Sequence, residues 1–309
     1  MLRMLWYFCV PRWLGISREW PCRYVAVCKC KGEKPGVSQM ISEKEQDNKW
    51  NMIKESITMK RLENKTAIVT GGNSGIGKAT AILFAKEGAD LVLCARRKEA
   101  LDEVAEECRK YGVQVVTVKA DVSSHEDCSA VVKAAVDTFG KVDILVNNAG
   151  IVDKHRPITE CTDEWWNEII AIDQSSLFYM MKDTIPHMMA AGKGSIINVS
   201  SIGGVFGNGG ISYSAAKSAA LAMTKNVAIQ LAPNGIRCNA VCSGPTPLNT
   251  PEKVAEFSTW FAERCAQHMD MSLPESSVED QANAILFFAE DASEAVTGQY
   301  LIVDHGTTI

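Results

Sequence analysis

The stretch AIVTGGNSGIG, residues 67–77, decides the fold class of this chain. Its first four residues form an apolar run of strand length, and a helical pattern follows the glycines over Gly77–Gly88. Such a turn lets a ligand approach unpaired N–H groups at the positive end of a helix dipole. Glycine also occurs in tight turns for steric reasons alone, but the strand–turn–helix context favours a pyrophosphate site. We expect it to comprise Gly71, Asn73, Ser74, Gly75, Ile76 and Gly77.

Apolar runs of strand length alternate with helical patterns throughout residues 60–309. The predicted strands are Ala67–Thr70, Leu91–Ala95, Val113–Val118, Ile144–Asn147, Ile196–Val199, Arg237–Val241 and Tyr300–Val303. The predicted helices are Gly77–Gly88, Lys98–Tyr111, Ser124–Phe139, Thr162–Ala191, Tyr213–Leu231 and Val278–Ala289. The strands lack polar alternation, which indicates that both sheet faces are covered. We therefore predict one Rossmann-like, doubly wound α/β domain. Its seven-stranded parallel sheet is flanked by helices, with a ligand crevice at the carboxyl ends of the strands.

Residues 1–59 differ in character and are expected to form a separate N-terminal extension. Residues 1–31 carry six basic side chains and one acid, Glu19. One interpretation is a targeting or membrane-surface segment, and another is a small metal site of Cys22, Cys28 and Cys30, although paired C-x-x-C spacing is missing. We favour a poorly ordered extension, or residues outside the natural protein with translation starting at Met40, Met52 or Met59.

Composition narrows the class of protein. A net charge of −5 argues against nucleic-acid binding, which usually requires a basic stripe. No apolar run reaches the roughly 18 residues of a membrane-spanning helix, so no membrane span is expected. Several of the eleven cysteines lie in apolar strand-like runs, as buried free thiols in a reducing compartment do. We expect a cytoplasmic protein.

The ends of the second and third predicted strands indicate the kind of dinucleotide. An NAD site usually places an acid after the second strand, and this chain has Arg96 and Arg97 there. A guanidinium suits a 2′-phosphate, so we expect NADP(H), with NAD as the alternative. Alternatively, Arg96 and Arg97 are two solvated side chains at the start of the next helix and bind no phosphate. After the third strand, Asp121 is placed to accept a hydrogen bond from the adenine amino group, and Val122 is expected to contact the cofactor beside it. Alternatively, Asp121 is a helix cap.

Four motifs in order now indicate a family. They are Thr70-Gly71-x-x-x-Gly75-x-Gly77, Asn147-Asn148-Ala149-Gly150, Ser201, and Tyr213-x-x-x-Lys217. In this order and spacing the chain resembles the classical short-chain dehydrogenase/reductase family from about Leu62 to Gly306. The resemblance implies that Asn148, Gly244 and Thr246 also contact the cofactor, and that the protein is a homodimer or homotetramer. It implies no metal.

Tyr213 and Lys217 lie four residues apart on a helical pattern, so they share a face. A nearby ammonium and a positive nicotinamide ring lower the pKa of a phenol, which can then exchange a proton with a carbonyl or alcohol oxygen. Ser201 can orient that oxygen, and Ser200 is a second candidate. Tyr213 and Lys217 are also expected to contact the cofactor.

The chain departs from the family at Asp173, where an asparagine that anchors a relay water is common. We expect one of two outcomes for Asp173. Either it holds the water of the proton relay and alters the pH dependence of the reaction, or it is only a structural substitution. The substrate lid is expected over Pro247–Pro274, with apolar bulk from Leu248, Phe257, Trp260, Phe261, Met269 and Met271. That composition suits a hydroxysteroid or another bulky secondary alcohol, unless these residues merely pack the lid.

Three functions follow from these patterns. The first is an NADP(H)-preferring oxidoreductase that interconverts a secondary alcohol and a ketone. The second is a 3-oxoacyl-thioester reductase of fatty-acid synthesis, which needs a basic surface that this acidic chain does not obviously offer. The third is a non-catalytic dinucleotide sensor, for which a complete Ser–Tyr–Lys set is unnecessary.

Overall fold

The computed structural model describes residues 60–247 and 258–309, so the interpretations of residues 1–59 lie outside the described residues. Within them, seven strands form one parallel sheet in the order β3-β2-β1-β4-β5-β6-β7. The strands are β1 Thr66–Thr70, β2 Asp90–Ala95, β3 Val115–Lys119, β4 Ile144–Asn147, β5 Gly194–Ser201, β6 Ile236–Ser243 and β7 Tyr300–Val303. This order reverses direction at β1 and β4, as the doubly wound prediction requires.

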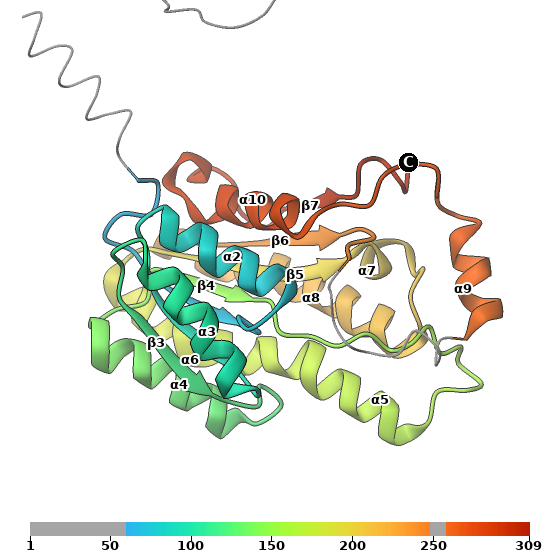
Figure 1. Cartoon of the computed structure of the whole chain (residues 1–309), viewed down its shortest axis with the longest axis horizontal. Coiled ribbons are helices and arrows are strands. Elements are labelled where there is room, and N and C mark those ends of the chain that lie inside the picture. Colours follow the sequence, from blue (N-terminus) through green and yellow to red (C-terminus); the bar gives the residue numbers. More distant parts are fainter. Residues whose placement is uncertain (1–59, 248–257) are drawn as a thin grey trace, which may run out of the picture. The chain divides into compact units, whose positions relative to one another are not determined.

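Helices cover both faces of the sheet (Figure 1). One face carries α2 (Gly75–Lys86), α3 (Lys98–Arg109) and α10 (Val278–Ala289), and the other carries α4 (His125–Phe139), α6 (Ser176–Ala191) and α8 (Ile211–Leu231). Strand β1 shows why the sheet is enclosed. Ala67 and Val69 pack into the cluster beneath α2 and α10, whereas Ile68 packs into the opposite cluster. Side chains of a strand alternate between faces, so an unbroken apolar strand must be buried on both.

The predicted helix over Thr162–Ala191 is correct in extent but not uniform. It consists of α5 (Asp163–Ile170), a π-helical turn η1 (Ala171–Ser175) and α6. Thr162 caps its start by accepting from Trp165 N–H at 3.2 Å. Four short helical elements of the described residues were not predicted. They are α7 (Ile202–Phe206) after β5, the 3₁₀ turn η2 (Ala232–Asn234), α9 (Thr259–Ala266) in the lid, and the 3₁₀ turn η4 (Asp291–Ser293) after α10.

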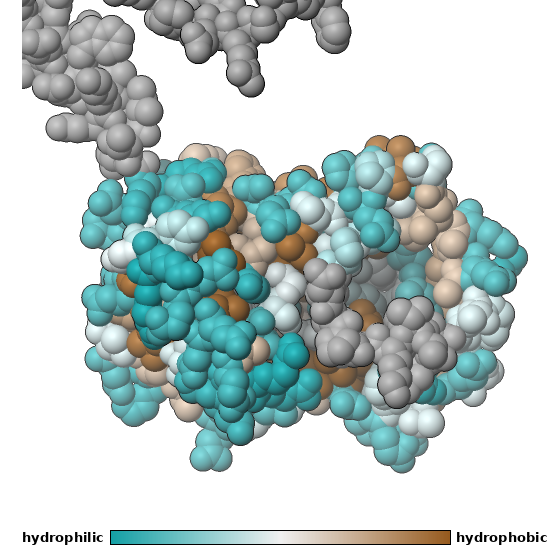
Figure 2. Space-filling view, viewed as in Figure 1, coloured by the Kyte–Doolittle hydropathy of each residue, from teal (hydrophilic) through white to brown (hydrophobic). Residues whose placement is uncertain are grey.

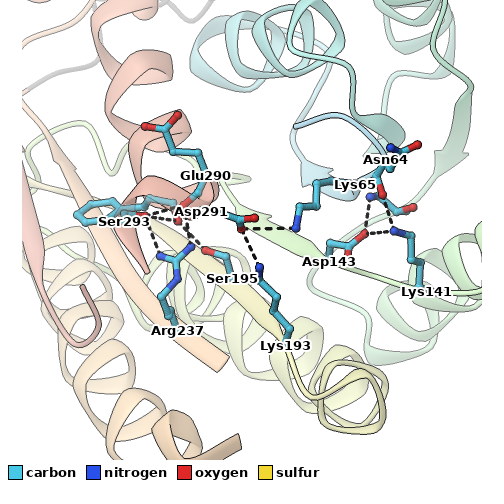
Figure 3. Close-up of polar contacts among 12 residues, drawn as sticks. Asn64, Lys65, Lys141, Asp143, Lys193, Ser195, Arg237, Glu290, Asp291 and Ser293 are labelled. Atoms are coloured by element: carbon cyan, nitrogen blue, oxygen red, sulfur yellow. Dashed lines mark hydrogen bonds and ion pairs between the residues drawn. The ribbon is translucent and has the colours of Figure 1, made fainter. Parts of the chain in front are cut away.

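Both ends of the sheet carry polar side chains. In Figure 1 the strand arrows of β5–β7 point toward the end where α7 and α9 lie. At the opposite, amino-terminal end, a cavity of about 310 Å³ is bordered by Lys65, Lys193, Arg237 and Asp291 among others. Figure 3 shows Lys65 and Lys193 converging on Asp291, while Arg237 reaches Ser293 and Glu290. These contacts join the first strand and the sixth to the turn after α10.

Hydrophilic side chains predominate on the face seen in Figure 2, with hydrophobic ones in smaller patches. Among the described residues, no helix combines the length and apolar character that crossing a membrane requires.

Candidate active site

A cavity of about 400 Å³ opens at the carboxyl ends of the central strands. It runs from the glycine-rich turn after β1, past the ends of β2 and β3, to the residues that follow β4 and β5. Of the predicted site residues, it is lined by Gly71, Asn73, Ser74, Gly75, Ile76, Arg96, Arg97, Asp121, Val122, Asn148, Asp173, Tyr213 and Lys217. The structure therefore brings together residues that the sequence scatters over about half of the chain.

The glycine-rich turn is held so closely that side chains are excluded. A Cβ at Gly77 would lie 2.2 Å from the carbonyl oxygen of Gly71, and Gly71 itself has a φ of +66°. Thr70 Oγ1 accepts from the backbone N–H groups of Asn148 and Ala149 at 2.9 and 3.0 Å. Asn148 Nδ2 donates to the Thr70 carbonyl at 2.9 Å. These contacts fasten the turn to the end of β4, so Asn148 supports the turn as well as lining the cavity.

The dinucleotide end has the features that a nicotinamide dinucleotide requires. The turn places the first residues of α2, with their unpaired N–H groups, against the cavity, as a pyrophosphate requires. Arg97 is engaged within the turn: Asn73 Oδ1, in the amide orientation that its neighbours favour, accepts from Arg97 Nη2 at 2.8 Å and Nε at 3.0 Å. Arg96 is exposed and borders the same cavity. Asp121 has a lowered pKa, because Ser123 donates to its carboxylate at 2.7 Å.

The chemical end is built by β5 and α8. Tyr213 and Lys217 share one face of α8, and Lys217 Nζ lies 5.4 Å from the centre of the Tyr213 ring. The Ser201 hydroxyl lies close enough to the Tyr213 phenol to lower its pKa, and it accepts from Gly203 N–H at 3.1 Å. Ser200 Oγ is instead committed to the Lys217 carbonyl at 2.8 Å. Of the two candidate serines, only Ser201 therefore presents its hydroxyl to the phenol.

Two further contacts fix the ammonium of Lys217. Its Nζ lies 3.1 Å from Asp173 Oδ2 and donates to the Val199 carbonyl at 3.3 Å. Asp173 comes from the π-helical turn η1, and its other oxygen accepts from Ile151 N–H at 2.8 Å. A π-turn inserts an extra residue and often marks a functional site. Here it directs a carboxylate toward the lysine.

The pKa of the Tyr213 phenol in the protein alone reflects burial and two neighbouring charges. Burial raises the pKa of Tyr213, Lys217 lowers it and Asp173 raises it again, so that the pKa lies above its ordinary value. The sign of the Lys217 effect is the expected one, and the expectation also counted on the positive charge of a bound nicotinamide ring. Desolvation is the strongest influence, because the loss of hydration disfavours the charged phenolate by more than the attraction of one ammonium favours it.

Some predicted residues lie elsewhere. Gly77, Ser201, Gly244 and Thr246 do not border the cavity, whereas Ser200 does. Gly244 packs against Asp304, and Thr246 Oγ1 donates to the Gly244 carbonyl at 3.0 Å. The residue from this segment that does border it is Ser243, at the end of β6. Sequence reasoning also missed Ile151, Val152 and Ile172 as lining residues. Ile151 and Val152 directly follow the motif Asn147–Gly150, and this position after β4 was the available signal.

The lid is only partly described. Leu248 and Phe257 lie outside the described residues, whereas α9 carries Trp260 and Phe261. Trp260 Nε1 donates to Glu160 Oε1 at 3.3 Å, and Ser258 N–H donates to the Lys154 carbonyl at 3.1 Å. The lid helix therefore rests on the connection between β4 and α5.

Comparison with known proteins identifies the family. A family model described as enoyl-(acyl carrier protein) reductase matches residues 71–308. A 3beta-hydroxysteroid dehydrogenase 2 of Eggerthella lenta is 36% identical over 247 residues, covering 79% of this chain and 95% of the relative. The chain belongs to the classical short-chain dehydrogenase/reductase family. As a member of this family, it is an NAD(P)-dependent oxidoreductase that acts on CH–OH donors.

Other short-chain dehydrogenase/reductases are similar to the same extent. A 3-oxoacyl-(acyl-carrier-protein) reductase of Thermotoga maritima is 36% identical over 250 residues, covering 81% of this chain and all of the relative. The solved structure of carveol dehydrogenase from Mycobacterium avium in complex with NAD superposes with a TM-score of 0.71 at 28% identity. That match covers 80% of this chain and 99% of the other. The predicted fold and family are confirmed.

Proposed function

We propose that this enzyme interconverts a bulky, apolar secondary alcohol and the corresponding ketone, with a preference for NADP(H). One observation carries the proposal: Tyr213 lies beside Lys217 at one end of the cavity, with the Ser201 hydroxyl close to its phenol. A proton donor, an orienting hydroxyl and an ammonium at that point are what carbonyl reduction requires of the protein.

Each side chain has a distinct role in the proposed reaction. The bound nicotinamide supplies or accepts the hydride. Ser201 donates a hydrogen bond that orients the substrate oxygen. Tyr213 gives its phenolic proton to that oxygen during ketone reduction and takes it back during alcohol oxidation. Lys217, which is fixed by Asp173 and Val199, favours the phenolate and is placed to hold the nicotinamide ribose.

Arg96 supports the preference for NADP(H). Strand β2 ends at Ala95, and the next residue on the cavity wall is Arg96 rather than an acid. Arg97 is already engaged with Asn73, so we assign the contact with a 2′-phosphate to Arg96, an exposed side chain on the cavity wall. A guanidinium and a phosphate form strong charge-assisted hydrogen bonds, whereas NAD offers only hydroxyls there.

The substrate class is inferred from the lid and from the relatives. Helix α9 carries adjacent Trp260 and Phe261, whose rings lie 5.6 Å apart between centres, and Trp260 is 53% exposed. Large aromatic side chains on a lid favour an apolar substrate. Similar proteins include hydroxysteroid dehydrogenases of Eggerthella lenta and of Clostridium sardiniense, the latter named as 7alpha-specific and 38% identical.

The test is a panel assay with NADPH and NADH side by side. The panel contains ketosteroids, cyclohexanone and an acetoacetyl thioester, and each is assayed with the unchanged enzyme and with Tyr213→Phe. The proposal predicts that ketosteroid reduction with NADPH is fastest and that Tyr213→Phe lowers kcat at least about 10²-fold. Preferential thioester reduction would support the second function instead. Nucleotide binding without any turnover would identify a sensor.

A further inference from the structure

Asp153 is a buried carboxylate that lies next to the proposed active site and is not used in the reaction described above. Only 2% of its surface is exposed. It follows the motif Asn147–Gly150 by three residues, in the irregular connection between β4 and α5. A charged group so deeply buried costs free energy unless hydrogen bonds compensate it, so its partners indicate its role.

Three donors compensate Asp153, and all belong to the start of α8. Gly210 N–H donates to Oδ1 at 3.1 Å, whereas the Ser212 hydroxyl and Tyr213 N–H donate to Oδ2 at 3.1 and 2.8 Å. A Cβ at Gly210 would lie 2.3 Å from either oxygen, so glycine is needed for this approach. The carboxylate therefore fixes the backbone of the residue that bears the phenol.

The same connection is tied to the other end of the site. Ile151 N–H, two residues before Asp153, donates to Asp173, the partner of Lys217. Ile151 and Val152 themselves line the dinucleotide cavity. One short segment of the cavity wall is thus connected to both of the proposed catalytic side chains. It contacts Lys217 through Asp173 and Tyr213 through Asp153.

We infer that Asp153 is a positioning residue that sets both the place and the acidity of the Tyr213 phenol. This inference rests on the proposed role of Tyr213. Asp153 sets the position of the phenol by accepting hydrogen bonds from Tyr213 N–H and from Gly210 and Ser212 at the helix start. The acidity follows from charge: a buried carboxylate near the phenol disfavours the phenolate.

Three groups set the phenol's titration besides Asp153. Lys217 on the same helix favours the phenolate, Asp173 on η1 opposes it, and the Ser201 hydroxyl on β5 favours it. Besides the Tyr213 phenol, the titratable groups that interact with Asp153 are Asp173 on η1, His155 in its own segment and the Cys265 thiol of α9. Burial lowers the pKa of His155, although Asp153 raises it, so this imidazole does not neutralise the carboxylate in alkali.

The decisive variant is Asp153→Asn, which keeps the shape and one acceptor but removes the charge. We expect the midpoint of the pH profile of kcat/KM for cyclohexanol oxidation with NADP+ to fall by roughly 0.5–1 pH unit. Asp153→Ala also removes every acceptor, and kcat should then fall by about 10- to 100-fold because the phenol is misplaced. The matched control is Asp280→Asn, which removes a carboxylate from the start of α10, outside the cavity, and should leave the midpoint unchanged.

A second readout does not depend on the choice of alcohol. Phenolate absorbance of the NADP+-bound protein, minus that of the same variant carrying Tyr213→Phe, reports the titration of Tyr213 alone. A lower midpoint in Asp153→Asn supports the inference. An unchanged midpoint overturns it, even if the thermal stability falls, because a merely structural carboxylate affects unfolding and not the phenol. If Tyr213→Phe retains full turnover, the proposed function itself fails, and the two failures are thereby distinguished.

Discussion

Lys217 and Asp173 form an ion pair of 3.1 Å in which 5% of the lysine side chain and none of the aspartate side chain is exposed. Burial alone lowers the pKa of Lys217, but Asp173 and Tyr213 together outweigh it, and the pKa is raised. The ammonium therefore stays charged at neutral pH. Coulombic attraction in so dry a site is much stronger than at the surface, which keeps the lysine in place beside Tyr213.

Asp173→Asn is expected to make the phenol more acidic. Asp173 raises the pKa of Tyr213, so removing its charge should move the midpoint of kcat/KM for alcohol oxidation to lower pH by about one unit. The measurement is a pH–rate profile from mildly acidic to alkaline pH. An unchanged profile would show that Asp173 is a structural substitution only.

Ser201→Ala is expected to lower kcat by about 10²-fold or more, because it removes the hydroxyl that contacts the phenol. Ser200→Ala is its matched control in the neighbouring position. Ser200 donates to the Lys217 carbonyl, so its loss should cost about 1 kcal/mol of unfolding free energy and change kcat only a few-fold. Steady-state kinetics and urea unfolding of both variants provide the comparison. Equal losses of activity would contradict the assignment of Ser201.

Arg96→Ala is expected to weaken NADP+ binding roughly 10- to 100-fold, because a charge-assisted hydrogen bond contributes about 1.5–3 kcal/mol. NAD+ binding should change little. Arg97→Ala offers the control, since Arg97 holds Asn73 in the turn that both dinucleotides share and should weaken both to a similar extent. Dissociation constants from fluorescence titration test this. A parallel loss of both cofactors in Arg96→Ala would refute the role of Arg96.

The regular parts of the site could be predicted because periodic patterns determine them. The spacing of Tyr213 and Lys217 on a helix predicted their common face, and the strand before Gly71 predicted the glycine-rich turn that lines the cavity. The choice between Ser200 and Ser201 required coordinates. Neighbours in a strand point to opposite faces, and a shift of one residue in the expected spacing exchanges them.

The residues that were missed depend on contacts distant in sequence. Asp153 lies 60 residues before Tyr213, in a segment with no periodicity, and its effect comes only from the way the chain folds back. The π-turn that directs Asp173 toward Lys217 leaves no mark in the apolar pattern of residues 162–191. Gly244 and Thr246 were assigned by resemblance, and the structure packs them against the chain end and against each other instead.

Arg237→Met should destabilise the fold more than any single lysine variant at the amino-terminal end of the sheet (Figure 3). Its guanidinium donates to Ser293 Oγ at 3.0 Å and to the Glu290 carbonyl at 3.2 Å, which joins β6 to the turn after α10. Losing these bonds should cost about 1.5–3 kcal/mol. Lys193→Met, which removes a half-exposed partner of Asp291, should cost under about 1 kcal/mol in the same urea-unfolding experiment. The reverse order would refute this account.

Asp291→Asn should lower stability at neutral pH but not in acid. Burial alone raises the pKa of Asp291, but Lys193 at 3.0 Å and Lys65 at 3.5 Å outweigh it and lower the pKa. A lowered pKa means that the carboxylate's contribution is complete above its ordinary value of 3.8 and disappears as the pH falls through the lowered value.

The side chain is 56% exposed, so solvent screening should keep the difference in unfolding free energy between this variant and the unchanged protein below about 1 kcal/mol. Urea unfolding at neutral pH and at a series of acidic pH values measures that difference. It should shrink toward zero as Asp291 becomes protonated. A difference that stays constant across the series would show that the carboxylate acts through its shape and not through its charge.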